Sequence, residues 1–115
     1  MSVQEMTQFE RDIIQYIINN ESPEHIGHLP LLMVVKRENT GVGIYVYFEY
    51  SHEPRISDAS SNTIGHQVYV DIEGLNGGAG CMLYIDEGRI TMLECYSHSA
   101  ESWPINIGRY DIRNL

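Results

Sequence analysis

Tyrosines and carboxylates alternate with aliphatic residues in two parts of the chain, residues 42–50 and residues 67–73. Successive side chains of a β-strand point to opposite faces, so this spacing places the polar side chains of each strand on one face of a sheet. The candidate partner-binding residues are Tyr45, Tyr47, Glu49, Tyr69, Asp71 and Glu73, joined by Tyr84 and Asp86 if their strand has the matching orientation. Tyrosine is enriched at protein interfaces, and carboxylates attract a basic partner over long range. The alternative is a solvated outer face, which is common in antiparallel sheets.

Histidine and cysteine side chains could hold a metal ion, but their spacing does not favour one. A structural zinc site normally includes at least one close pair of Cys or His ligands. His25 and His28 are spaced as such a pair, but they lie in a segment that we expect to be a loop. Cys81 and Cys95 are far apart in the sequence. We therefore interpret the histidines as surface residues and the cysteines as buried, inert thiols, and we expect neither a metal nor a cofactor.

Two pairs of carboxylates could serve acid–base chemistry or bind a divalent cation, namely Asp71 with Glu73 and Asp86 with Glu87. The sequence places no nucleophile and no positioned histidine around either pair. The glycine-rich residues 74–80 lack the Gly-Lys-Ser/Thr ending of a phosphate-binding loop, and a strand is expected after them where a helix would be needed. We expect no catalytic residue and no enzymatic activity, and we interpret residues 74–80 as a flexible connection.

The charge balance restricts the classes of partner. The chain has 115 residues, with 7 Lys+Arg against 16 Asp+Glu and a formal net charge of −9. Binding to nucleic acid depends on clustered basic residues, and Lys36 is the only lysine, so we expect no nucleic-acid partner and no membrane partner. The first ten residues do not resemble a secretory signal, the longest apolar stretch is far too short for a membrane span, and two cysteines are typical of a reduced domain. These features predict a single domain, residues 1–115, in the cytoplasm.

The elements that must position these residues follow from hydrophobic periodicity. Apolar residues at spacings of three and four predict a helix of about 16 residues, beginning after a capping box at Ser2-Val3-Gln4-Glu5. Strands are expected at residues 31–36, 42–50, 67–73, 81–85 and 90–96, with a long exposed loop at 51–65 and a last short strand within 105–112. This order predicts an α+β fold, in which the N-terminal helix packs on a five- or six-stranded, mainly antiparallel sheet.

The register of the hairpin between residues 81–85 and 90–96 stays open. A two-residue turn at Glu87-Gly88 pairs Asp86 with Arg89. A three-residue turn with Gly88 as a bulge pairs Ile85 with Arg89 and turns every side chain of the second strand to the opposite face.

The last third of the chain resembles a known family. Asp86-Glu87-Gly88-Arg89-Ile90, then Leu93-Glu94-Cys95-Tyr96-Ser97 and Glu101-Ser102-Trp103-Pro104, are similar to the C-terminal hairpin and exit of small bacterial immunity proteins of contact-dependent growth inhibition and related polymorphic toxin systems. In these systems a cytoplasmic protein neutralises a cognate toxin domain. The resemblance implies a non-enzymatic protein that blocks a basic toxin domain, such as a nuclease. Contacts vary between toxin–immunity pairs, so the resemblance assigns no interface residues.

Two further hypotheses come from other classes of protein. The first is a small ligand-binding or enzymatic α+β domain with a pocket between helix and sheet, using His66, Asp71 or Glu73. The second is a homo-oligomer held together by the tyrosine-rich face.

Overall fold

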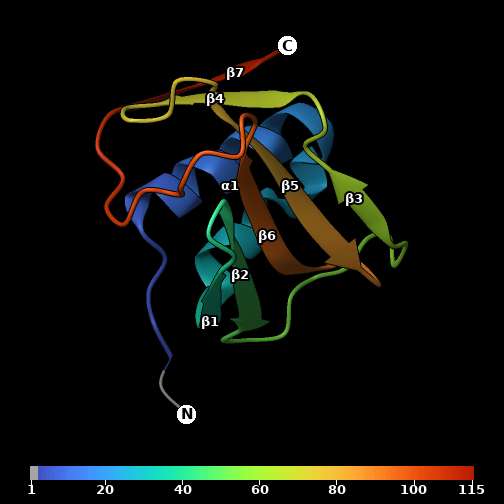
Figure 1. Cartoon of the computed structure of the whole chain (residues 1–115). Coiled ribbons are helices and arrows are strands. Elements are labelled where there is room, and N and C mark those ends of the chain that lie inside the picture. Colours follow the sequence, from blue (N-terminus) through green and yellow to red (C-terminus); the bar gives the residue numbers. More distant parts are fainter. Residues whose placement is uncertain (1–2) are drawn as a thin grey trace.

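The computed structural model describes residues 3–115 and confirms the α+β class. The elements in chain order are α1 (Gln8–Glu21), η1 (Pro23–Leu31), β1 (Leu32–Asn39), β2 (Gly43–Tyr50), β3 (Asn62–Ile64), β4 (Val68–Ile72), β5 (Ala79–Asp86), β6 (Arg89–Ser97) and β7 (Tyr110–Asn114) (Figure 1). Within residues 3–115 the strands form one seven-stranded antiparallel sheet in the order β1-β2-β6-β5-β4-β7, with β3 paired to β5. The additional strand arises because residues 62–64, which the sequence places in a loop, pair with β5.

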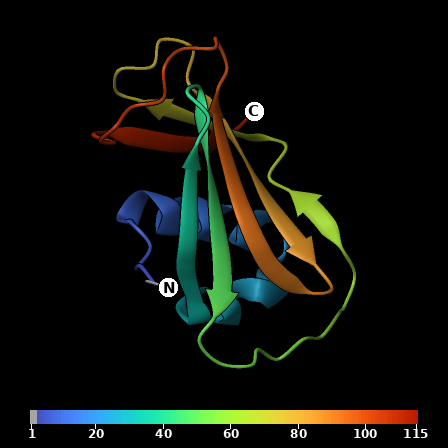
Figure 2. The same ribbon diagram turned by 60° about the horizontal axis from the view of Figure 1, so that its bottom comes forward.

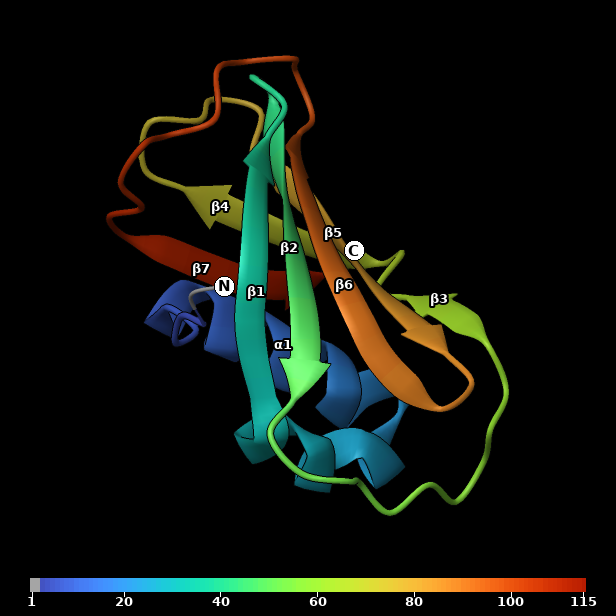
Figure 3. The same cartoon turned by 90° about the horizontal axis from the view of Figure 1, so that it is seen from below.

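The sheet has two unlike faces. Helix α1 lies against one face, here called the inner face, while the outer face carries no helix in the described part of the chain (Figures 1 and 2). Strands β1, β2, β6 and β5 run side by side, whereas β4 and β7 lie at a steep angle to them (Figure 3). Only two residue pairs, Tyr69 with Gly80 and Val70 with Ala79, join β4 to β5. This short contact leaves the rest of β4 free to turn away from the long strands.

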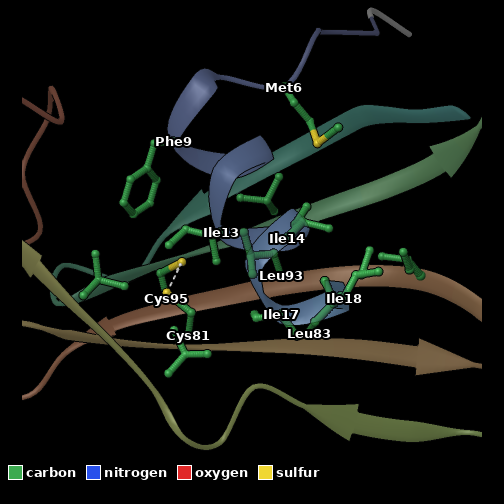
Figure 4. Packing of buried hydrophobic residues seen from close by; sticks show 14 of the residues in the cluster. Met6, Phe9, Ile13, Ile14, Ile17, Ile18, Cys81, Leu83, Leu93 and Cys95 are labelled. Atoms are coloured by element: carbon green, nitrogen blue, oxygen red, sulfur yellow. Dashed lines mark hydrogen bonds between the residues drawn. The ribbon is translucent and has the colours of Figure 1, made fainter. Parts of the chain in front are cut away.

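The inner face and α1 share one hydrophobic core (Figure 4). Its members with no exposed surface include Ile13, Ile14, Ile17 and Ile18 of α1 and Val46, Leu83 and Leu93 of the sheet. Full burial of one such aliphatic side chain contributes about 1.5–3 kcal/mol. Cys81 and Cys95 are buried in the same core, directly opposite each other on β5 and β6, with 3.2 Å between their Sγ atoms. The hydrogen bond between the two thiols, together with burial, raises the pKa of the Cys95 thiol well above its usual value.

The N-terminal helix begins later than its sequence predicts. Thr7 is the N-cap: its backbone N–H donates to Glu10 Oε1 at 2.8 Å, and the Glu10 N–H donates to Thr7 Oγ1 at 3.2 Å. The predicted cap, Ser2, lies outside the described residues, and Gln4 forms two backbone hydrogen bonds with Val34 of β1 in place of a helical turn. Two capping boxes compete in this sequence, and the second one starts the helix because the first segment pairs with the edge of the sheet.

The hairpin adopts the two-residue turn. Asp86 pairs with Arg89, and Glu87 and Gly88 have positive φ angles of 49° and 79°, as a type I′ turn requires. The register then shifts, because Ile85 pairs with Ile90 but Tyr84 pairs with Met92, so β6 has one extra residue, Thr91. This bulge sets the faces of β6 beyond it: Leu93 and Cys95 point inward, and Met92, Glu94 and Tyr96 point outward.

The interpretation of His25 and His28 as surface residues was wrong. Both lie in η1 and are buried, with 7% and 5% of their surface exposed. His25 Nε2 bonds to the Gly88 carbonyl at 2.9 Å and its Nδ1 to Ser22 Oγ at 2.7 Å. Each nitrogen of His28 is also bonded, Nδ1 to the Tyr50 hydroxyl at 2.8 Å and Nε2 to the Arg55 carbonyl at 2.9 Å. The two rings therefore fasten η1 to the β5–β6 turn, to β2 and to the loop that follows β2.

Candidate partner-binding surface

The outer face of β1, β2, β6 and β5 gathers aromatic, methionine and carboxylate side chains. Its residues include Lys36, Glu38, Tyr45, Tyr47, Glu49, Met82, Tyr84, Met92, Glu94 and Tyr96. The local reason is strand alternation, since their neighbours Val46, Leu83 and Leu93 are fully buried on the inner face. The tyrosines and methionines of this set are half-buried although no helix covers them, because they pack against one another across the strands.

Two rows of side chains cross the outer face. The first row runs Glu38, Tyr45, Glu94 and Met82, and the second runs Lys36, Tyr47, Met92 and Tyr84. Residues directly opposite each other on antiparallel strands have Cβ atoms about 4.5–5.5 Å apart, so each row is a line of contacting side chains. Strand β6 lies between β2 and β5, and its Glu94 is therefore surrounded by aromatic and sulfur-containing side chains of these neighbouring strands.

Glu94 organises the tyrosines around it. The Tyr84 hydroxyl donates a hydrogen bond to Glu94 Oε1 at 2.8 Å, and this bond is the main cause that raises the pKa of Tyr84 to about 12. The negative charge of Glu94 also raises the pKa of Tyr45. Both phenols therefore remain protonated and act as hydrogen-bond donors. This chemistry suits recognition, because a phenol whose proton is held this firmly is a poor base or nucleophile at neutral pH.

Negative charge predominates on the outer face. Lys36 is its cation, and that ammonium lies 3.3 Å from Glu38 Oε2 and 5.5 Å from the centre of the Tyr47 ring. The next basic residue, Arg37, lies on the other side of β1 and forms an ion pair with Glu10 of α1 at 2.8 Å. Glu49 and Glu94 form no ion pair with residues 3–115. The outer face therefore presents carboxylates whose charge is not neutralised by an ion pair within residues 3–115.

The structure brings four of the eight predicted residues together on this face: Tyr45, Tyr47, Glu49 and Tyr84. Tyr69 lies at one corner, beyond Gly80, where it stacks on His98 with 5.5 Å between ring centres and 7° between ring planes. Tyr96 meets the same His98 ring edge-on, also at 5.5 Å. Tyr69 is thus connected to the outer face through one exposed histidine.

The other three predicted residues lie apart from the outer face of β1, β2, β6 and β5. Asp71 and Glu73 follow the two residues that pair β4 with β5, so they continue with β4 away from the long strands. Asp71 is opposite Asp111 of β7 and forms an ion pair with Arg113 at 3.3 Å. Asp86 lies at the hairpin turn, where Ser61 Oγ donates to it at 3.0 Å. Sequence alternation gave the correct face of each strand, but it did not show that β6 and β5 separate β2 from β4.

Sequence reasoning missed the contributions of Met82, Met92, Glu94 and Tyr96. The signal was present, because polar or flexible residues alternate with Leu and Cys through residues 81–85 and 90–96. Assigning them to a face needed the hairpin register together with the bulge at Thr91, and neither could be derived from spacing alone.

The glycine-rich loop binds a carboxylate of its own chain. Glu101 accepts hydrogen bonds from the backbone N–H of Gly77 at 2.9 Å and of Asn76 at 3.1 Å, and these bonds lower the pKa of Glu101. The loop amides that could hold an external anion are therefore occupied by the segment that follows β6.

A cavity of about 500 Å³ opens between the start of α1, the inner face of β2 and β6, and residues 103–107. Its apolar lining includes Phe9, Ile44, Trp103 and Tyr110, and its polar lining includes the Arg37–Glu10 ion pair. His66, Asp71 and Glu73 do not line it. A space between helix and sheet thus exists, but away from the residues that the sequence suggested for it.

Residues 3–115 contain neither a cluster of metal ligands nor a membrane-spanning helix. No three His, Cys, Asp or Glu side chains of this range lie where they could hold a metal ion together. Within the same range, no helix has the length and apolar character needed to cross a membrane. Comparisons with protein-family models, with curated proteins and with solved structures found no match to the chain.

Proposed function

We propose that this chain is a non-enzymatic binding protein that holds a basic protein partner on its outer face, and that the partner is a toxin domain which it neutralises. The observation that carries the proposal is a sheet face of half-buried tyrosines and methionines with carboxylates that lack a counterion from residues 3–115. Tyrosine gives an interface large rigid contact area with a polar tip, and methionine adapts to irregular shapes.

The charge of the molecule supports a basic partner. A formal net charge of −9 accelerates association with a cationic protein through long-range attraction. The same charge disfavours binding to nucleic acid or to an anionic membrane surface, so a basic protein is the class of macromolecule that fits best.

The family resemblance supports the toxin as the specific partner. The segment that resembles immunity proteins includes most of β6, which supplies Glu94 and Tyr96 to the outer face. Neutralisation requires tight binding, with a Kd of about 1 nM or lower, which corresponds to about −12 kcal/mol.

Co-expression with the product of the neighbouring gene tests this proposal. We expect that gene product to arrest growth when expressed alone, and co-expression of this chain to restore growth. Two variants make the test specific: Tyr45→Ala removes an outer-face ring, whereas Tyr16→Ala removes a half-buried ring from α1. Neighbouring genes without toxicity, or rescue that both variants support equally, would contradict the proposal.

The cavity beside α1 favours a second candidate function, the binding of a small amphipathic molecule. Its volume of about 500 Å³ is within the range of ordinary ligand sites. Trp103 lines it and is the only tryptophan, so its fluorescence reports on occupancy. Titration with dodecanol should change this fluorescence in a saturable way, and Ile44→Phe, which fills part of the cavity, should suppress the change. A linear response identical in both proteins would exclude the site.

A further inference from the structure

Three cations of the chain share one local arrangement. In each case a basic group lies over a tyrosine ring while a carboxylate also contacts it. The three sets are Lys36 with Tyr47 and Glu38, Arg89 with Tyr50 and Glu53, and Arg113 with Tyr69 and Asp71. The cations lie 5.5, 5.7 and 4.8 Å from the ring centres and 3.3, 2.5 and 3.3 Å from the carboxylate oxygens, respectively. Ring and carboxylate together make a recurrent receptor for a cation in this protein.

A fourth set on the outer face has the rings and the carboxylate but no cation. Tyr45 lies directly opposite Glu94 on the neighbouring strand, and Tyr84 donates its hydroxyl to Glu94 Oε1 at 2.8 Å. No Lys, Arg or His of residues 3–115 forms an ion pair with Glu94. A carboxylate has about four lone-pair sites, so the bond from Tyr84 leaves acceptor sites for another donor.

We propose that Glu94, flanked by Tyr45 and Tyr84, receives an arginine side chain of the protein partner. This inference rests on the proposed function and specifies its chemistry. A guanidinium is planar, stacks on aromatic rings and donates two parallel hydrogen bonds to a carboxylate, whereas an ammonium is a point charge. Glu94 is half-buried in the central strand of the outer face, where an ion pair is less screened by salt than at an exposed edge.

The position of Glu94 agrees with the usual anatomy of an interface. Residues that dominate binding lie near the centre and are surrounded by contacts that exclude water. Met82 is directly opposite Glu94 on β5, and Met92 is opposite Tyr84, so a bound arginine would be enclosed by these side chains as well as by the two rings.

The test uses a defined probe rather than the partner. Protein carrying ¹³C-labelled methionine methyl groups is titrated with the capped peptide acetyl-Gly-Arg-Gly-amide, and in parallel with acetyl-Gly-Gln-Gly-amide. We expect saturable shifts of the Met82 and Met92 methyl signals with the arginine peptide, and no saturable shift with the glutamine peptide. Glu94→Gln should weaken arginine binding by about fivefold or more, because it removes the charge from the ion pair.

A matched variant separates this site from the general charge of the molecule. Glu21→Gln removes one carboxylate at the exposed end of α1, on the opposite side of the sheet, and should titrate like the unmodified protein. Equal titration of Glu94→Gln and the unmodified protein, or equal shifts with both peptides, would overturn the inference.

The growth assay keeps the two proposals distinct. If Glu94→Gln restores growth as well as the unmodified chain and also binds the arginine peptide equally, the arginine acceptor fails while toxin neutralisation stands. If the peptide binds at Glu94 as expected but the unmodified chain gives no rescue, the toxin is excluded and the arginine acceptor stands.

Discussion

The inner and outer faces of β2, β5 and β6 are built by alternate residues of the same strands, yet they differ in what covers them. On the inner face Val46, Leu83 and Leu93 are sealed by α1 and have no exposed surface. On the outer face Tyr45 and Glu94 are half-buried, and only neighbouring side chains of the sheet cover them. The inner face therefore buries its apolar surface on folding, whereas the outer face leaves its surface accessible to the proposed partner. Substitutions one position apart should separate stability from binding.

The largest expected contrast is between Leu93→Ala and Met92→Ala. Loss of the fully buried leucine should lower the free energy of unfolding by about 3 kcal/mol, through lost burial and a residual cavity. Loss of the outward methionine should lower it by less than about 1 kcal/mol. Urea unfolding followed by circular dichroism measures both values. Similar losses of unfolding free energy in the two variants would mean that the two faces contribute equally to stability, contrary to the description above.

A pair of tyrosines gives the next contrast. The Tyr50 hydroxyl accepts a hydrogen bond from the Ile90 N–H at 2.8 Å and bonds to His28 Nδ1 at 2.8 Å, whereas the Tyr47 hydroxyl has only a 3.4 Å contact with Glu38. Tyr50→Phe should cost about 1–3 kcal/mol because it leaves partly buried polar groups unpaired. Tyr47→Phe should change stability by less than about 0.5 kcal/mol. Thermal unfolding of the two variants compares them, and a larger loss for Tyr47→Phe would reverse the assignment.

Substitutions on the outer face should affect partner binding more than stability. Tyr47→Ala should weaken partner binding by about 1 kcal/mol or more, while the thermal midpoint stays nearly unchanged. Asp71→Lys is the matched comparison, because Asp71 lies on β4 away from the outer face and pairs with Arg113. Calorimetric titration of the proposed partner, the product of the neighbouring gene, into each variant measures the effect. Weakening by Asp71→Lys alone would shift the interface to β4 and β7.

The smallest effect is a pH dependence that arises away from the outer face. Burial lowers the pKa of His28, so the folded state favours the neutral ring. Its stabilising contribution is complete above the unfolded value of about 6.5 and is lost as the pH falls from there through the lowered folded value. Unfolding free energies measured between pH 7.5 and pH 5 should therefore decrease, and His28→Gln should flatten that decrease. The same slope in both proteins would assign the effect to other groups.

The alternating pattern predicted part of the surface and missed the rest for a physical reason. The faces of β2 follow from a period of two within one strand, which is local information, and Tyr45, Tyr47 and Glu49 were placed correctly. The neighbour of β2 depends on pairing between distant segments, and that neighbour is β6 rather than the strand that carries Tyr69 and Asp71. Glu94 consequently replaces Asp71 as the carboxylate beside the tyrosines.

The start of the helix and the burial of the histidines also depend on contacts between distant segments. The apolar spacing of α1 predicted an apolar stripe that includes the buried Ile13, Ile14 and Ile17, but it predicted neither the burial of Ile18 nor the capping box that begins the helix. Nothing in the sequence near His25 and His28 indicates burial, because their partners Gly88, Tyr50 and Arg55 come from later segments. The face on which a side chain lies within one element was thus predictable, whereas features that depend on pairing between distant segments were not.

The pairing of Gln4 with Val34 has a consequence for self-association. β1 is an edge strand, and unpaired backbone groups at a sheet edge can recruit another chain and start aggregation. Two backbone hydrogen bonds between Gln4 and Val34 occupy part of that edge, and the irregular register between Val34 and Lys36 interrupts the next part. These features oppose growth of the sheet into a polymer. Deletion of the first six residues should therefore lower the concentration at which the protein aggregates.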